Sequence, residues 1–205
     1  MNLLEADAKL RQIEQPCLRT RDVAAYLGIS TVYASNVLRR LAGANRIIRL
    51  GRGRWLINEI SDRYAIPEYL TSPWPAYISL HTALHHHGLI SQIPSVVYAV
   101  SLARTARYKN PAGEFSIHHI NPTFFFGYEL TGKFRVKIAV PEKALLDYLY
   151  LFPARSRLFR SLPEIEFPRS FKVKVVYAMI EKIPSRAKQS LVRTHFDRIY
   201  RAIVG

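Results

Sequence analysis

Apolar side chains recur at helical spacing in the first third of the chain. The apolar residues between positions 3 and 13 predict a first helix, which Pro16 must end or closely follow. A second, short helix is predicted over 20–27, with Thr20 as its cap and Gly28 as the left-handed residue behind it. A third segment of the same period follows at once, and this order is typical of a helix-turn-helix.

The third helix is expected to begin after Ser30, a good N-cap residue. Its apolar residues repeat at three- and four-residue intervals and are expected to face the core: Ala34, Val37, Leu38 and Leu41. The opposite face carries hydroxyl, amide and guanidinium groups: Thr31, Tyr33, Ser35, Asn36, Arg39 and Arg40. Such groups bind base edges and phosphates in DNA. The residues of the first turns, up to Asn36, are the candidates for base recognition, and the two arginines are the candidates for phosphate contacts.

Two strand-like segments, 46–50 and 54–57, follow the third helix and are joined by Gly51-Arg52-Gly53, which predicts a tight hairpin. Arg52 at the tip is expected to enter a flanking minor groove or to lie on the DNA backbone. Arg49 and Arg54 beside it are expected to add sequence-independent attraction.

This order of elements predicts a winged helix-turn-helix that binds double-stranded DNA. From Arg39 through Arg54 the chain has six arginines and no acid, so the third helix and the hairpin are expected to share one positive surface. A winged helix used for protein contacts is the alternative.

Three prolines between Pro67 and Pro75 interrupt regular structure and place a domain boundary near Pro67. Residues 1–67 are assigned to the winged helix-turn-helix and residues 68–205 to a second domain. The pattern of the second domain predicts a helix over 77–88, a largely antiparallel sheet over 96–102, 104–109, 115–120, 123–128 and 134–140, and helices from Pro141, over 172–182 and over 185–203. The expected fold class is α+β, with a mixed α/β second domain.

The charge balance extends the expected DNA contact beyond the first domain. The chain has 30 Lys and Arg against 15 Asp and Glu, a net charge of +15. Residues 1–67 carry 11 basic and 6 acidic side chains, and residues 68–205 carry 19 and 9, so both domains are basic. A field of this size attracts polyanions, and nucleic acid is the expected partner. A merely basic protein, or one that binds anionic membranes, is the alternative.

Two further observations bear on the compartment. No apolar run is long enough to cross a bilayer, and the acidic start lacks the features of a signal peptide, so we expect a cytoplasmic protein without membrane contact. Cys17 is the only cysteine, which excludes an intrachain disulfide and a zinc finger.

Histidines and phenylalanines provide candidate sites in the second domain. His81 and His85 are four residues apart on one helix face, a spacing that holds zinc when a third ligand and a nearby Glu complete the site. No Glu lies between them, and His118 and His119 are expected in a strand, where neighbouring side chains point to opposite faces. Structural histidines are therefore favoured over a metal site and over a switchable or DNA-contacting cluster. The phenylalanines of 124–126 are assigned to the core rather than to a stacking platform for single-stranded bases.

The carboxylates show no spacing diagnostic of a magnesium site: Glu129, Glu142, Asp147, Glu164 and Glu166. The segment after Pro141 is better explained as a helix with Pro in its first turn, Glu142 near the positive end of its dipole and an apolar stripe. The sequence contains no Gly-rich phosphate loop, nucleophile elbow or zincin motif. We therefore expect no catalytic residue, no metal and no cofactor.

Three parts of the chain resemble the AbiEi-type antitoxin and transcriptional-regulator family. They are Leu38-Arg39-Arg40-Leu41 with the hairpin from Arg49 to Trp55, the stretch from Ser79 to Leu89 followed by Gln92-Ile93-Pro94, and the stretch from Pro141 to Asp147. The resemblance implies an N-terminal winged helix followed by an α/β antitoxin domain, with a positive face shared by both. It also implies a repressor of its own operon that counteracts a co-encoded nucleotidyltransferase-like toxin without catalysis.

Two other functions remain open at this point. A nucleic-acid enzyme targeted by its helix-turn-helix would need a magnesium site that includes Glu142 or Asp147. A stand-alone regulator that responds to a ligand would need a roomy apolar pocket with converging polar groups.

Overall fold

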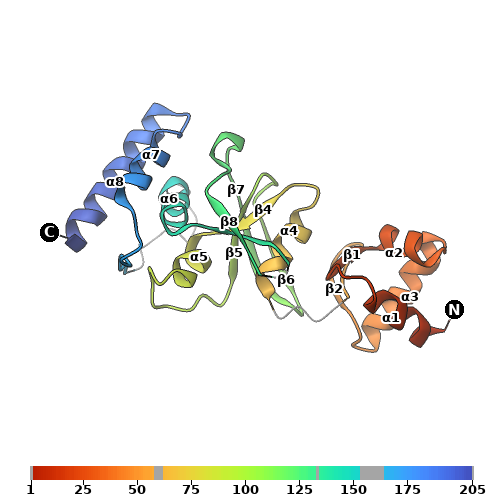
Figure 1. Cartoon of the computed structure of the whole chain (residues 1–205). Helices are drawn as coiled ribbons and strands as arrows, with labels where there is room; N and C mark the ends of the chain where they lie inside the picture. Colours follow the sequence, from red (N-terminus) through yellow and green to blue (C-terminus); the bar gives the residue numbers. More distant parts are fainter. Residues whose placement is uncertain (1, 58–61, 133, 153–163, 205) are drawn as a thin grey trace.

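The computed structural model describes residues 2–57, 62–132, 134–152 and 164–204. A small N-terminal domain lies at one end and two C-terminal helices lie at the other, with a sheet between them (Figure 1). The fold class is α+β, as the hydrophobic pattern predicted. No helix in the described part of the chain is long and apolar enough to cross a bilayer.

The N-terminal domain is a three-helix unit with a three-stranded sheet. Its elements are α1 (Leu3–Arg11), β1 (Cys17–Arg19), α2 (Thr20–Leu27), α3 (Thr31–Gly43), β2 (Ile48–Gly51) and β3 (Arg54–Leu56). The strand order is β1-β3-β2, and both pairings are antiparallel. The sequence pattern did not predict β1, because three residues are too few to show an alternation of apolar and polar positions.

Local signals explain where the helices of this domain begin and end. Ser30 Oγ accepts a hydrogen bond from Tyr33 N at 3.2 Å, which caps α3, and Gly28 ends α2 with a positive φ of 65°. The prediction that Thr20 caps α2 is wrong. The cap is Arg19, whose N–H donates to Asp22 at 3.0 Å, while the Thr20 hydroxyl accepts from Trp55 Nε1 at 2.9 Å.

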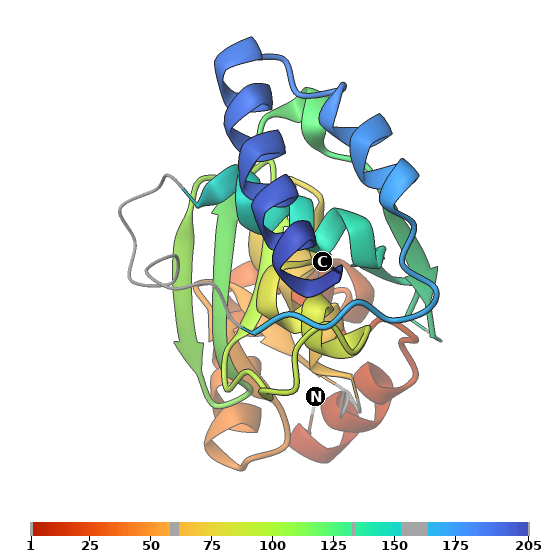
Figure 2. The ribbon, with the colours of Figure 1, turned by 90° about the vertical axis from the view of Figure 1, so that its left-hand side faces the viewer.

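The C-terminal domain is built on a six-stranded sheet. Its elements are α4 (Ile66–Thr71), β4 (Ala76–Ile78), α5 (Leu80–His86), β5 (Val97–Ser101), β6 (Ala106–Asn110), β7 (Gly113–His119), β8 (Tyr128–Thr131), β9 (Val136–Ala139), α6 (Pro141–Leu151), α7 (Val173–Ile180) and α8 (Arg186–Val204). The strand order is β6-β7-β5-β4-β9-β8. Figure 1 shows α6 between the sheet and the pair α7 and α8, and in the end-on view of Figure 2 α8 lies in front of α6.

The sheet is mixed rather than largely antiparallel. β5 pairs with β7, and β4 with β9, in parallel, while the other three pairings are antiparallel. The expectation of a largely antiparallel sheet overlooked β4, because two of its three residues, Tyr77 and Ile78, were assigned to the following helix. All three are buried, and this short central strand brings β5 and β9 into one sheet.

Two other segments differ from the pattern-based expectation. The aromatic stretch 123–128 is not a strand before Tyr128, where β8 begins. Pro122–Phe124 form a 3-10 turn capped by Asn121 Oδ1, which accepts from Thr123 N at 3.0 Å. The proline-rich boundary contains α4, because Pro67 lies in its first turn, where its missing N–H breaks no helical hydrogen bond.

The three-stranded sheet of the N-terminal domain, which contains the wing strands β2 and β3, has buried apolar side chains on both of its faces. Side chains alternate along a strand, so Leu18 and Trp55 enter the N-terminal core while Cys17, Leu50 and Leu56 join the core of the C-terminal domain. Burial raises the pKa of the Cys17 thiol to about 12, so it is an apolar contact here. The apolar contact between the two domains is therefore made by the face of this sheet that carries Cys17, Leu50 and Leu56.

Helix α6 is buried on almost all sides, because it contacts α5, α7 and α8 as well as β9. Lys143 and Asp147, one helical turn apart, form an ion pair with neither side chain exposed. Lys143 Nζ donates to Tyr77 Oη at 2.8 Å, and Asp147 Oδ2 accepts from Tyr77 at 2.8 Å and from Ser79 at 2.7 Å. A satisfied ionic network thus replaces part of the apolar stripe that was expected for this helix.

Candidate DNA-binding surface

The polar face of α3 is open to solvent. Its buried residues are the four that the spacing predicted, namely Ala34, Val37, Leu38 and Leu41. The candidate DNA contacts are exposed, except that Ser35 is half-buried: Thr31, Tyr33, Ser35, Asn36, Arg39 and Arg40. The helix therefore presents hydroxyl, amide and guanidinium groups on a single accessible face.

Two details of α3 were not visible in the sequence pattern. The Arg39 guanidinium donates to Asn36 Oδ1, so the candidate phosphate ligand also orients the candidate base-reading amide. Val32, in the first turn, is 74% exposed. An exposed apolar side chain at this end of the helix is suited to contact with a thymine methyl group.

The wing tip is a two-residue turn. Gly51 pairs with Arg54, so only Arg52 and Gly53 lie between the strands, and Gly53 has a φ of 66°, which favours glycine. Arg52 is exposed at this tip. The predicted three-residue tip was one residue too long, because the ladder has an irregularity between Arg49 and Gly51.

Not every arginine of the 39–54 stretch is available for DNA. Arg46 pairs with Asp7 at 2.7 Å, and Asp7 is 3% exposed. Arg54 is half-buried and donates to Ser72 O at 3.3 Å in the other domain. Arg49 stays exposed, with its guanidinium carbon 5.8 Å from the centre of the Trp55 ring. Arg39, Arg40, Arg49 and Arg52 are thus the arginines of this stretch that are exposed without a contact to Asp7 or to the other domain.

The histidines of α5 make contacts within the fold. His85 Nδ1 lies 3.3 Å from Ile90 O, and His87 Nε2 lies 2.7 Å from Ala139 O. His81 packs against Tyr98 and Tyr148, and burial lowers its pKa. Among the residues that the structure describes, no three His, Cys, Asp or Glu side chains come together to hold a metal ion.

The candidate stacking residues and carboxylates also have structural partners. Phe124 is fully buried and stacks on Tyr150, with 4.7 Å between ring centres. Glu142 accepts from Lys172 N at 2.7 Å, and Asp147 lies in the buried ionic network. Three other carboxylates are exposed, namely Glu129, Glu164 and Glu166. Three arginines of the basic segment before α7, namely Arg155, Arg157 and Arg160, lie outside the described residues.

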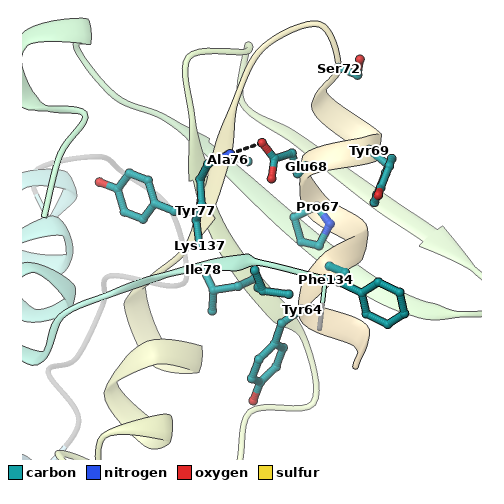
Figure 3. Close-up of a pocket in the computed structure, with 12 residues that line it drawn as sticks. Tyr64, Pro67, Glu68, Tyr69, Ser72, Ala76, Tyr77, Ile78, Phe134 and Lys137 are labelled. Atoms are coloured by element: carbon teal, nitrogen blue, oxygen red, sulfur yellow. Dashed lines mark hydrogen bonds and ion pairs between the residues drawn. The ribbon is translucent and has the colours of Figure 1, made fainter. Parts of the chain in front are cut away.

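A cavity of about 280 Å³ lies between α4 and strands β4 and β9 (Figure 3). Aromatic rings of Tyr64, Tyr69 and Phe134 line it, and Glu68 and Lys137 form an ion pair within its wall. Ligand sites usually have volumes above about 300 Å³, so this cavity is at the lower limit for a small organic molecule.

Comparison with known families agrees with the geometry of the N-terminal domain. Residues 8–58 match the sequence model of a family described as transcriptional regulator, AbiEi antitoxin. No curated protein sequence matches the chain. The matched segment runs from the end of α1 to just beyond β3, and so includes α2, α3 and the wing. The N-terminal domain thus matches, over residues 8–58, the model of AbiEi antitoxin transcriptional regulators, the family that the sequence resembles.

Proposed function

We propose that this protein is an autorepressing antitoxin that binds double-stranded operator DNA. The exposed polar face of α3, in a domain that matches a family of transcriptional regulators, carries the proposal. We assign α3 to the major groove and the wing tip at Arg52 to the adjacent backbone or minor groove. The division into residues 1–67 and 68–205, with a boundary that falls in the first turn of α4, and a cytoplasmic location beside the operator are parts of the same proposal.

The operator is tested with DNA from upstream of the protein's own gene. Fluorescence anisotropy with labelled duplexes should give an affinity at least a thousandfold higher than that for random DNA of equal length. Equal affinities for the two duplexes would exclude a specific repressor.

The antitoxin role requires a second gene product. We propose that a nucleotidyltransferase-like toxin is co-encoded and that this protein opposes it without catalysis of its own. The buried positions of Glu142 and Asp147 support the absence of a magnesium-dependent activity, because neither carboxylate faces solvent. Growth arrest by the neighbouring gene product, relieved by co-expression of this protein, is the expected result; persistent arrest would refute the antitoxin role.

Arg52→Ala should weaken binding to operator and random DNA by the same factor. Because one phosphate contact is lost, the slope of log K against log salt should become less steep by about one. Titrations at several salt concentrations measure this. Lys9→Ala is the matched control, since this exposed ammonium pairs with Glu5 on α1 at 2.9 Å. An unchanged slope for Arg52→Ala would contradict the assignment of the wing.

Asn36→Ala should instead change sequence preference. A side-chain amide that reads a base edge contributes about 1–3 kcal/mol of discrimination. The variant should therefore lose up to about a hundredfold in operator affinity, with little change on random DNA and no change in salt slope. A proportional loss on both duplexes would show that Asn36 does not read a base.

The cavity beside α4 favours a second candidate function, a regulator that responds to a small molecule. Its wall includes Ser72, which also contacts Arg54 of the wing, so a bound ligand could alter the position of the DNA-binding domain. A metabolite that shifts both Tm and operator affinity, with both shifts lost in Lys137→Met, would support this function. Metabolites that leave operator affinity unchanged would argue against it.

A further inference from the structure

The turn between α4 and β4 is held rigidly. Trp74 N donates to Thr71 O at 3.1 Å, and the Thr71 hydroxyl donates to Trp74 O at 2.8 Å. Pro73 and Pro75 flank the tryptophan and restrict its backbone further. The turn therefore presents Trp74 in a defined position.

The same turn is tied to the DNA-binding domain. Ser72 O accepts from Arg54 at 3.3 Å, and the Ser72 hydroxyl contacts the Arg19 guanidinium. Arg54 directly follows the wing tip, and Thr20 N donates to Gly53 O at 3.0 Å, which joins the start of α2 to that tip. Figure 1 shows α4 on the side of the C-terminal domain that faces β1 and β2.

Trp74 is 52% exposed, whereas Trp55, the other tryptophan, is 2% exposed. Trp74 is two residues from Ser72, so their Cα atoms are at most about 7 Å apart. No side-chain hydrogen bond or ring contact ties the indole to the described residues, although a tryptophan usually buries most of its area. The large amphipathic side chain of Trp74 is thus exposed in a turn that contacts the wing.

The charges around the turn favour a polyanion. Arg19 and Arg54 contact the turn, and Arg21 and Arg52 are two residues from them along the chain. The acid among them, Asp22, accepts from Arg19 N at the start of α2. An acidic protein would also suit this charge. DNA is favoured because the wing tip at Arg52, which we propose to contact DNA, lies next to this turn.

We propose that Trp74 is a DNA contact supplied by the C-terminal domain, on the backbone next to the segment that the wing covers. This inference rests on the proposed DNA-binding function. The indole Nε1–H donates to a phosphate oxygen, and the ring packs on the adjacent deoxyribose. Because the turn is already ordered, binding costs little conformational entropy. The contact extends the footprint beyond the winged helix without adding charge.

Tryptophan fluorescence of the full-length protein tests the proposal directly. Acrylamide should quench Trp74 in the free protein and Trp55 very little, because of their different exposure. Saturating duplex from upstream of the gene should reduce the quenching constant at least twofold. Trp74→Phe provides the baseline of Trp55, and anisotropy of the labelled duplex shows that the complex has formed.

Affinity provides the second measurement. Trp74→Ala should weaken binding to this duplex roughly tenfold, the size of one hydrogen bond to a charged group. Trp74→Phe keeps a ring but lacks the donor, so its affinity for the duplex should lie between those of the wild type and Trp74→Ala. Ile203→Ala is the matched control, since Ile203 is 41% exposed on α8, at the opposite end of the molecule in Figure 1.

The outcomes are distinguishable. Undiminished quenching in a complex that has formed, or wild-type affinity of Trp74→Ala, would overturn the Trp74 contact and leave DNA binding by the winged helix intact. In that case, protection of Trp74 by an acidic protein would reassign the surface to a protein partner. If the wild-type chain binds neither operator nor random DNA, the proposed function and this inference both fail.

Discussion

Lys143→Met should destabilise the protein by about 3–5 kcal/mol, because it leaves Asp147 buried without its cation. Burial lowers the pKa of Lys143 and raises the pKa of Asp147, so burial disfavours the charged form of both groups, and their mutual contact is the main interaction that opposes this. The Tyr77 and Ser79 hydroxyls that donate to Asp147 cannot replace the lost ammonium. Urea unfolding followed by circular dichroism measures the loss.

Two controls identify the cause of that loss. Lys143→Met combined with Asp147→Leu should recover most of the stability, since an apolar pair of similar volume can replace a buried ion pair. Lys137→Met removes a partly exposed ion pair with Glu68 and should cost less than about 1 kcal/mol. Equal losses for Lys143→Met and the double variant would show that the volume of α6 side chains matters, and not the unpaired charge.

Acidification from pH 6.5 to 4 should remove about 3 kcal/mol of stability through His118, since each unit of pKa depression corresponds to about 1.4 kcal/mol. Burial, with smaller contributions from Arg107 and His81, lowers the pKa of His118 from 6.5 to about 4. Between these values the unfolded chain binds a proton that the folded chain does not. The stabilisation is therefore complete above pH 6.5 and is lost as the pH falls to 4.

The pH dependence has a matched pair of variants. His118→Gln can keep a hydrogen bond to Ser116 Oγ, which lies 3.0 Å from His118 Nε2, and should flatten the stability curve between pH 4 and 6.5. His119→Gln changes the exposed neighbour and should leave the slope as it is in the wild type. Urea midpoints at half-unit pH intervals measure both. A wild-type slope in His118→Gln would assign the acid sensitivity to the carboxylates.

The parts of the fold predicted correctly from the sequence depend on near neighbours. Ser30 begins α3 and Gly28 ends α2 through hydrogen bonds and torsions within a few residues. The buried face of α3 follows from its period, and so does the exposed face that holds the DNA-contact candidates. The nine candidates on α3 and the wing are the DNA contacts that we propose.

The features that were missed depend on partners distant in the chain. Strands β1 and β4 are three residues long and are strands only because β3, β5 and β9 pair with them. Arg46 and Arg54 were counted with the DNA-facing charges, but Asp7 and Ser72 bind them. The i, i+4 spacing of Lys143 and Asp147 is also typical of an exposed ion pair, but α5, α7 and α8 pack around α6 and bury this one.

Periodicity and caps act over one or two helical turns, so the winged helix, its accessible polar helix face and its basic hairpin could be predicted from local patterns. Long-range packing sets which arginines remain exposed, how the strands of the sheet are ordered and which elements the wing contacts. It also placed Trp74 beside that wing, far from it in sequence and open to solvent. Burial and pairing are properties of the assembled fold, since a side chain's desolvation depends on every element packed against it.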